Sequence, residues 1–257
     1  DTSADTTIYA GYDVDYGDRF TYRIENDNVI LESFIIDYDS SEALVIPATI
    51  RLHPVTKIDA GFFDETTSWM ANYSSLYFPA DSMVTEIGER AFFGACFKSV
   101  TLPRTLVRID GEAFACSQLT SVSFPASLER IGKGAFTSCI YLKSVDFSQS
   151  AFLNVIGDSA FSLCSAIGNV SIPDSVSVMG DYCFEGCETL LRIRIGRGVK
   201  SVGLHSFRGC SSLCSIDVDE KNAYYRTIRS DLYTKDGTYL IRYCFGKNEK
   251  EYTVPDG

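Results

Sequence analysis

One motif recurs along most of the chain and restricts its fold more than any other feature. In "IGKGAFTSCIYLKSVDFS", which begins at Ile131, an aliphatic residue precedes a phenylalanine by five positions. Equivalent phenylalanines follow one another at steps of 22 to 29 residues: Phe63, Phe92, Phe114, Phe136, Phe161, Phe184 and Phe207. Neither the helical period of 3.6 nor the strand period of 2 accounts for the motif. A repeat of this length instead indicates a solenoid.

Stacking of successive coils explains the uneven apolar pattern inside each repeat. A coil of about 20 residues cannot bury its own apolar face, so it must pack on its neighbours. We therefore expect each phenylalanine to lie over the phenylalanine of the preceding coil. A second ladder is predicted from the aliphatic residues that stand three positions before each opening residue: Val55, Val84, Leu106, Leu128, Leu153, Val176 and Val199.

Short alternating segments that end in proline predict the strands of the coils. In "VTLP", Val100 and Leu102 would point inward and Thr101 outward. Proline has no N–H to extend a ladder and so marks the strand end. We expect eight such strands in a parallel sheet, starting near residues 44, 76, 100, 122, 145, 170, 193 and 216. The "GxxAFxxC" part of each coil, such as residues 180–187, predicts one α-helical or 3₁₀ turn.

The full repeat, "L-x-x-I-G-x-x-A-F-x-x-C-x-x-L-x-S-V-x-I-P", resembles the BspA-like leucine-rich repeat. The resemblance implies a right-handed, β-rich α/β leucine-rich-repeat solenoid of stacked parallel strands with short helical turns. It divides the chain into an acidic tail and β-hairpin cap (1–43), an array of about seven coils (44–219), and a hairpin spacer with the start of a further repeat (220–257).

Both ends of the chain contain hairpin signals. Near the N-terminus, residues 20–24 alternate in polarity, "ENDN" forms a turn, and residues 29–36 are again apolar, which predicts a hairpin over the first coil. Near the C-terminus, Asp236-Gly237 is a favoured hairpin turn between residues 232–233 and 239–241. "YTVPDG" matches the start of another coil, so we expect either a longer native array or an end capped by residues beyond this sequence. The first residue is Asp rather than Met, which suggests processing.

Charge and hydropathy argue against several functional classes. The formal net charge of −11 opposes general nucleic-acid binding and docking on an anionic membrane, both of which need basic surfaces. The sequence contains no run of about 18 apolar residues, so it does not predict a membrane span. An acidic surface suits a partner that carries basic patches.

The cysteines follow the repeat. The number of cysteines is nine, so they cannot all form intrachain disulfides. One slot in four successive coils holds Cys139, Cys164, Cys187 and Cys210, which we interpret as small buried side chains. The spacings Cys183/Cys187 and Cys210/Cys214 leave a zinc site as an alternative. A disulfide between Cys214 and Cys244 would need Cα atoms within about 7 Å.

Other candidate chemistry is weak. His53 and His205 are the only histidines, and a Ser–His–Asp site would need a geometry that the sequence does not reveal. "DVDYGD", at residues 13–18, lacks the glycine position and the final glutamate of an EF-hand, so a solvated acidic tail is the better interpretation. Trp69 is interpreted as a packing residue of a long loop. We expect no enzyme activity, no metal and no cofactor.

The outward strand positions are the candidate binding residues. Solenoids commonly bind partners on an extended concave face, although a merely solvated face would have the same polarity. On this basis we predict a binding face made of Tyr77, Thr101, Ser123, Asp146, Ser171, Arg192, Arg194 and Asp217.

Function is inferred from the resemblance. BspA-like proteins imply a secreted or cell-surface protein, on the outer surface of a bacterium, that mediates protein–protein interaction and adheres to host matrix glycoproteins such as fibronectin and fibrinogen. The alternative is a carbohydrate-binding or structural spacer module of a larger surface protein. Sugar sites need aromatic platforms, and Tyr77 is the only aromatic residue among the outward positions.

Overall fold

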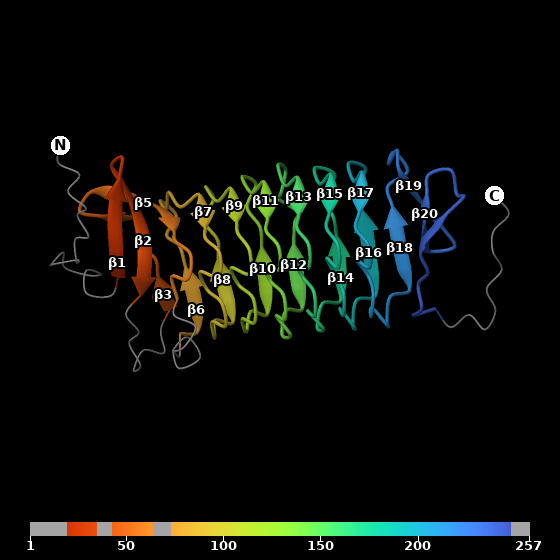
Figure 1. The fold of residues 1–257 in the computed structure, drawn as a ribbon, viewed down its shortest axis with the longest axis horizontal. Helices are drawn as coiled ribbons and strands as arrows, with labels where there is room; N and C mark the ends of the chain where they lie inside the picture. Colours follow the sequence, from red (N-terminus) through yellow and green to blue (C-terminus); the bar gives the residue numbers. More distant parts are fainter. Residues whose placement is uncertain (1–19, 35–42, 64–72, 248–257) are drawn as a thin grey trace.

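The chain forms an elongated stack of coils with the N- and C-terminal segments at opposite ends (Figure 1). The computed structural model describes residues 20–34, 43–63 and 73–247. Successive coils each contribute one strand to each of two rows that run along the long axis. The expected parallel-strand solenoid is therefore confirmed.

The first strand row consists of parallel strands, all of which except β5 are only two residues long. Its members are β5 (His53–Ile58), β7 (Glu86–Ile87), β9 (Arg108–Ile109), β11 (Arg130–Ile131), β13 (Val155–Ile156), β15 (Val178–Met179) and β17 (Ser201–Val202). The opening aliphatic residue of each repeat points inward and pairs in register with its neighbours, as Ile109 does with Ile87 and Ile131. The repeat does not predict these strands, because two residues are too few to show alternation.

The second strand row contains the eight strands that the sequence predicts. They are β3 (Ala43–Val45), β6 (Ser75–Tyr77), β8 (Ser99–Thr101), β10 (Ser121–Ser123), β12 (Ser144–Asp146), β14 (Asn169–Ser171), β16 (Arg192–Ile195) and β18 (Ser215–Val218). They pair in parallel in three groups, β3-β6-β8, β10-β12 and β14-β16-β18. The central residue of each strand points into the core, as Val122 and Val145 do in adjacent strands.

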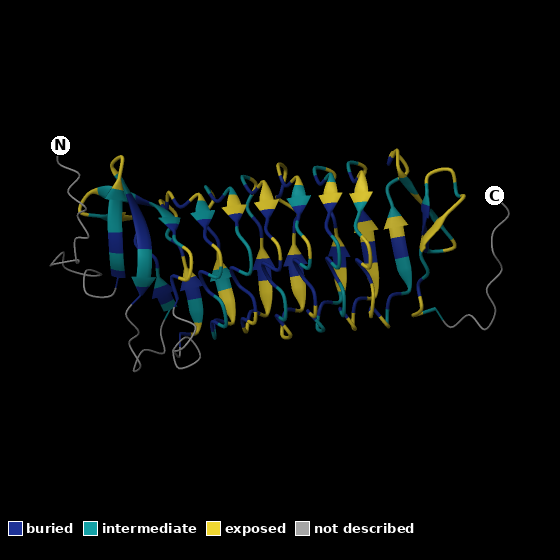
Figure 2. Cartoon of the chain, in the orientation of Figure 1, coloured by how far each residue is buried: buried dark blue, intermediate teal, exposed yellow. Residues whose placement is uncertain are grey.

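Stacked phenylalanines fill the space between the two rows. The rings of Phe114 and Phe136, of Phe136 and Phe161, and of Phe161 and Phe184 are each 5.3 Å apart and lie within 7° of parallel. All four side chains are completely buried. Figure 2 shows buried residues alternating with exposed ones in every coil. Burial of each ring contributes about 1.5–3 kcal/mol, so the ladder is a main source of stability.

The predicted helical turns are wrong, since the structure forms no helix within the residues it describes. From Phe92 to Phe207, the residues two positions before and after each repeat phenylalanine have positive φ, for example Glu112 (52°) and Cys116 (58°) around Phe114. A right-handed helix cannot pass through such left-handed residues. The backbone N–H of Phe114 instead donates to the Ala135 carbonyl of the next coil, at 2.8 Å. Hydrogen bonds between coils thus replace those of a helical turn.

Hairpins are present near both ends. β1 (Phe20–Glu25) and β2 (Asn28–Phe34) are antiparallel, and β2 pairs in parallel with β5. A small strand, β4 (Thr49–Ile50), pairs with β5. After the last coil, β19 (Tyr225–Ile228), β20 (Asp231–Thr234) and β21 (Leu240–Arg242) form an antiparallel sheet with the predicted turn at Gly237. The three-part domain division stays a prediction.

Several sequence hypotheses concern residues outside the described ranges. These are the acidic tail with residues 13–18, Trp69, and the start of a further coil in residues 252–257. They also stay predictions.

Candidate binding face

The second strand row brings together every residue predicted to bind. The eight side chains are exposed, with the following positions: Tyr77 on β6, Thr101 on β8, Ser123 on β10, Asp146 on β12, Ser171 on β14, Arg192 and Arg194 on β16, and Asp217 on β18. Register pairing aligns them along the axis, as between Ser171, Arg194 and Asp217. The exposed parts of these strands appear as the lower yellow strip in Figure 2. Their role in binding stays a prediction.

The middle of this face is neutral and rich in hydroxyl groups. The side chains of Thr101, Ser123 and Ser171 form no hydrogen bond or ion pair with other described residues. Tyr77, at one end, is 42% exposed. Each hydroxyl can both donate and accept a hydrogen bond, so this strip can meet either kind of group on a partner.

Charged residues occupy the C-terminal end of the face. Arg194 Nη2 lies 2.8 Å from Asp219 Oδ2 and 3.7 Å from Asp174 Oδ1. Arg192, two positions earlier, has no ion pair with any described residue and stands in register with Asn169 and Ser215. Arg192 is therefore the better placed of the two arginines to pair with a carboxylate of a partner.

A cleft of about 450 Å³ adjoins this end, between β18 and the C-terminal hairpin. Acidic residues from the end of β18 form one wall and basic residues of the hairpin form the other: Asp217, Asp219 and Glu220, then Arg226 and Lys235. Lys235 Nζ donates to the Glu220 carbonyl at 3.0 Å, which ties the hairpin to the last coil. We refer to the cleft between β18 and this hairpin as the Asp217 cleft.

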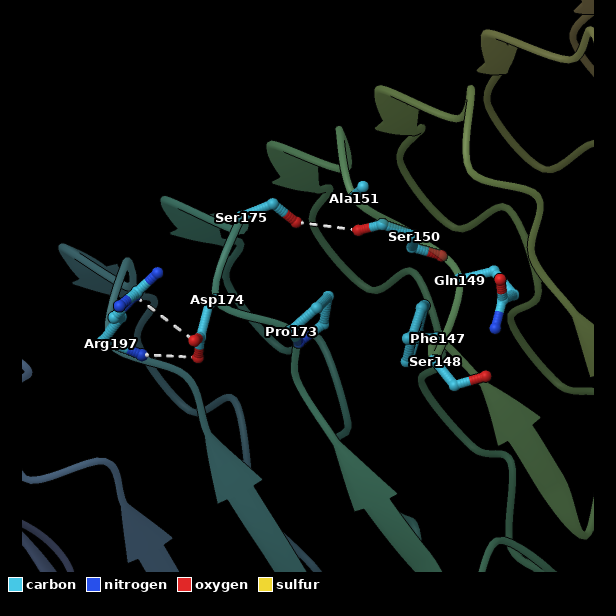
Figure 3. Close-up of a pocket in the computed structure, with 9 residues that line it drawn as sticks. All are labelled: Phe147, Ser148, Gln149, Ser150, Ala151, Pro173, Asp174, Ser175 and Arg197. Atoms are coloured by element: carbon cyan, nitrogen blue, oxygen red, sulfur yellow. Dashed lines mark hydrogen bonds and ion pairs between the residues drawn. The ribbon is translucent and has the colours of Figure 1, made fainter.

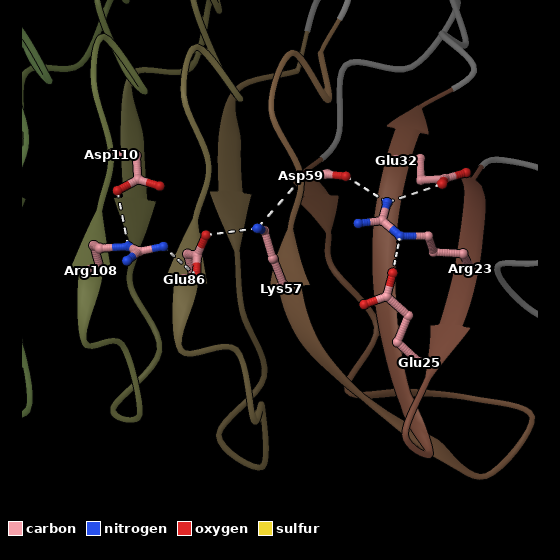
Figure 4. Close-up of polar contacts among 8 residues, drawn as sticks. All are labelled: Arg23, Glu25, Glu32, Lys57, Asp59, Glu86, Arg108 and Asp110. Atoms are coloured by element: carbon pink, nitrogen blue, oxygen red, sulfur yellow. Dashed lines mark hydrogen bonds and ion pairs between the residues drawn. The ribbon is translucent and has the colours of Figure 1, made fainter.

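The outward side chains of the first row behave differently, because ion pairs join them across coils (Figure 4). Glu86 accepts from Lys57 at 2.8 Å on one side and from Arg108 at 2.7 Å on the other. Arg23 of the hairpin reaches Asp59 at 2.6 Å. We call this set the ion-pair ladder; its members are Arg23, Glu25, Glu32, Lys57, Asp59, Glu86, Arg108 and Asp110.

Ion pairing lowers the pKa of two carboxylates in this ladder, Glu86 and Asp59. Burial alone would raise the pKa of Glu86, but the hydrogen bonds from Lys57 and Arg108 outweigh it, so the pKa lies below its ordinary value. For Asp59, burial is likewise outweighed by the hydrogen bond from Arg23, and its pKa is lowered. Both groups therefore stay ionised and hold the hairpin and first coils together at neutral pH.

Comparison with known families identifies the repeat. The family described as BspA type leucine rich repeat region matches residues 56–190 and 151–242, with six copies. The chain belongs to this BspA-type leucine-rich repeat family. No curated protein matches the chain.

Solved structures of similar fold are bacterial leucine-rich repeat proteins. The pneumococcal vaccine antigen PcpA is 25% identical, with a TM-score of 0.63 over 92% of this chain and 56% of PcpA. A leucine rich cell surface protein from Faecalibacterium prausnitzii A2-165 is 22% identical, with a TM-score of 0.62 over 93% of this chain and 63% of that protein. The T. pallidum protein TpLRR is 24% identical, with a TM-score of 0.55 over 77% of this chain and 78% of TpLRR. The chain thus spans little more than half of PcpA.

Cysteine in the BspA-type repeat has a structural position. All nine cysteines lie in the described residues, and none forms a disulfide. In the shared slot, the thiol of each cysteine donates to the phenylalanine carbonyl of the preceding coil, as from Cys139 to Phe114 at 3.1 Å. Burial raises the pKa of Cys164 and Cys187, and that of Cys210 to about 11. Thiols with raised pKa values are poor nucleophiles and poor metal ligands.

Neither the zinc alternative nor a catalytic histidine gains support from these BspA-type coils. Among the described residues, no three His, Cys, Asp or Glu side chains gather in a way that could hold a metal ion. His53 Nδ1 lies 3.2 Å from the Asp27 carbonyl, whereas the ring of His205 packs 5.3 Å from that of Tyr182 in another coil. Within the same described ranges, no helix is long and apolar enough to cross a membrane.

The repeat pattern does not predict two groups of polar residues that the structure brings together. The ion-pair ladder joins residues that lie up to 36 positions apart, and only the stacking register reveals their contact. Asp174 and Arg197 line a second cleft at the ends of the second-row strands (Figure 3). The sequence does contain a sign of this cleft. Leu153 follows Phe147 by six positions, whereas Leu128 follows Phe124 by four, so the turn beside the cleft is two residues longer.

Proposed function

We propose that this BspA-type repeat protein is an extracellular adhesion module that binds another protein through its second strand row. The partners that we propose are host matrix glycoproteins such as fibronectin and fibrinogen. The protein acts by binding alone, with no catalytic step and no cofactor. The family and its leucine-rich surface-protein neighbours support a role in protein interaction at the bacterial surface.

One observation carries this proposal. The outward side chains from Thr101 to Ser171 are exposed and contribute little to holding the coils together, so they remain available to a partner. Repeats that stack by their inner side chains leave such an outer strip free to vary without loss of the fold. Arg192, without an ion pair among the described residues, adds a charged anchor of the kind that often dominates an interface.

A matched pair of bulky substitutions tests which face binds. Ser171→Trp places a large side chain on the second row, and Ser201→Trp places the same side chain on the first row; both serines are exposed strand residues. We expect the first variant to lose binding to immobilised fibronectin or fibrinogen and the second to retain it, as measured by surface plasmon resonance. Equal binding by both variants would contradict the proposal.

The net charge of −11 adds a second expectation. Attraction between this acidic protein and basic patches of a partner is screened by salt, so affinity falls as ionic strength rises. The same binding measurement at low and high sodium chloride checks this. If the affinity does not change with salt, charge attraction does not contribute to binding. The tryptophan variants test the strand face independently of that result.

A further inference from the structure

Two consecutive residues on the outer surface depart from the repeat. Leu191 lies directly before β16, and Arg192 is the first residue of that strand (Figure 1). The residues equivalent to Leu191 in the other regular coils are polar or small: Lys98, Thr120, Lys143, Gly168 and Cys214. Those equivalent to Arg192 are small and uncharged: Ser99, Ser121, Ser144, Asn169 and Ser215. The fold therefore does not require leucine or arginine at these two positions.

Backbone hydrogen bonds place Leu191 in one column with its equivalents. The Gly168 N–H donates to the Lys143 carbonyl at 3.3 Å, and the Leu191 N–H donates to the Gly168 carbonyl at 2.7 Å. Arg192 pairs in register with Asn169, the residue after Gly168. Lys143 and Leu191 therefore stand two coils apart, about 10 Å along the axis, with Gly168 between them. We use the name Gly168 patch for Lys143, Gly168, Leu191 and Arg192.

The Gly168 patch has an apolar part with open space beside it. Leu191 is 48% exposed, and a Cβ atom on Gly168 would have nothing within 4 Å. The absence of a side chain at Gly168 leaves a gap in the column between Lys143 and Leu191. An apolar group that enters this gap can cover the exposed leucine, and both groups then lose contact with water.

The same patch carries two cations that have no carboxylate. Lys143 and Arg192 are exposed and form no ion pair with any residue in the described ranges. The acidic residues nearest to them in sequence, Asp146 and Glu188, are only three and four positions away. Arg194, by contrast, is held by Asp219 at 2.8 Å. In a chain with a net charge of −11, two cations left unpaired around one gap are a local exception, and they favour carboxylates from a partner.

We propose that the Gly168 patch binds a segment of a partner protein in which acidic residues lie on both sides of an apolar residue. In an extended segment, residues i, i+2 and i+4 point to one side, and the outer two are about 13 Å apart. The long side chains of Lys143 and Arg192 can reach carboxylates at that separation. An anionic membrane is not the expected partner, because it needs a larger basic cluster than two residues.

This inference rests on the proposed function for the claim that the partner is a protein, and it adds the chemistry that the partner presents. The test titrates the whole chain, labelled with nitrogen-15, with a nine-residue peptide in which glutamate, leucine and glutamate alternate with alanine. We expect the largest changes in amide NMR signals at Gly168, Leu191 and Arg192. Two control peptides, one with lysine in place of both glutamates and one with serine in place of leucine, should bind at least about fivefold more weakly.

Variants of the chain test the two kinds of contact separately. Arg192→Ala and Leu191→Ser should each weaken binding of the glutamate peptide about fivefold to tenfold. Their matched controls are Arg130→Ala, an exposed arginine of the first row, and Leu204→Ser, a leucine that is 72% exposed after β17. Both controls should bind as the unmodified chain does. Thermal melts confirm that each variant is folded.

The inference is overturned if the glutamate peptide does not bind at millimolar concentration, if the lysine peptide binds equally well, or if the signal changes lie away from the Gly168 patch. It is also overturned if Arg192→Ala and Arg130→Ala behave alike. Binding of the unmodified chain to fibronectin and fibrinogen is measured separately. Binding of the peptide at the patch without either protein would make those partners wrong and leave the inference standing, whereas binding of either protein without the peptide would overturn the inference alone.

Discussion

The two strand rows share one core and one spacing between coils but differ on their outer surfaces. In the first row, Glu86 joins Lys57 to Arg108, so the outward side chains connect three coils. In the second row, Ser123 and Ser171 occupy equivalent outward positions and connect nothing. One row therefore helps to hold the N-terminal end of the stack together. The middle of the other row is exposed, and we propose that it contacts a partner.

A repeat protein of this kind can keep stability and recognition on separate side chains. Stability comes from inner side chains that each contact the neighbouring coils, together with a few ion pairs at the end where the hairpin joins. Recognition needs outer side chains that are not already satisfied. Outer positions that carry no structural contact can change freely from coil to coil.

The largest effect is expected from the core that both rows share. Phe136 is completely buried and stacks between Phe114 and Phe161 at 5.3 Å. Phe136→Ala should lower the free energy of unfolding by about 3–5 kcal/mol, because it leaves a cavity in the ladder. Chemical denaturation measures this. Ser123→Ala, on the outer face of the second row, should change stability by less than about 0.5 kcal/mol, and equal effects would mean that the inward and outward positions are misassigned.

The next largest effect tests how closely the coils approach beside the first row. A Cβ atom on Gly180, which follows β15, would lie 2.4 Å from the backbone nitrogen of Asp158 in the preceding coil. Gly180→Ala should therefore destabilise the protein by about 1–3 kcal/mol through overpacking. Gly168, just before β14 of the second row, has nothing within 4 Å of the same position. Thermal unfolding should show Gly168→Ala to be far milder, and a reversed order would contradict the stacking described here.

A smaller and pH-dependent effect is expected for the ion-pair ladder. Because the pKa of Glu86 is lowered in the folded protein, its ionised form stabilises the fold above the ordinary glutamate pKa of about 4.3. This contribution is lost as pH falls through the lowered value. Glu86→Gln should cost about 0.5–1 kcal/mol at neutral pH, as expected for partly solvated ion pairs, and the difference from the unmodified chain should shrink in acid.

Denaturation at a series of pH values measures that difference. Glu129→Gln is the control, since Glu129 is exposed and its side chain forms no ion pair with the described residues. If both substitutions have the same pH profile, the ladder contributes nothing specific to stability.

The smallest effect on stability is expected at Arg192, where we predict a change in binding instead. Arg192→Ala should alter the unfolding free energy by less than about 0.5 kcal/mol, because the side chain is exposed and makes no ion pair within the described ranges. It should weaken binding to fibronectin or fibrinogen at least about tenfold, as truncation of an interface arginine often does. Arg130→Ala, at an exposed outward position of the first row, is the matched control. Loss of stability without loss of binding would reverse the roles assigned to the rows.

Much of this architecture could be predicted from the sequence, because inward residues repeat their chemical type. Phe114, Phe136 and Phe161 recur at one position of the repeat, which predicts the phenylalanine ladder. Proline follows several of the second-row segments, which predicts where those strands end. The left-handed residues beside each phenylalanine were harder to see. Some of these residues are glycines, such as Gly134 before Phe136 and Gly186 after Phe184. Glu112 and Tyr182 adopt the same left-handed conformation, because hydrogen bonds between coils stabilise it.

The outer surface was predictable only in part. The positions that face outward follow from strand alternation, so all eight predicted binding residues lie on one row. Which outward side chains contact each other depends on the register between coils, as for Arg23 and Asp59, and single-sequence patterns do not contain it.

The bonds between coils also determine how the molecule responds to force. The backbone hydrogen bonds that link one coil to the next, such as Phe136 N to Ala160 O at 2.8 Å, run along the long axis of the stack. Tension applied between the two ends therefore opens a few bonds at a time, and coils peel away in sequence. A stack built in this way lengthens gradually under tension instead of breaking at one point.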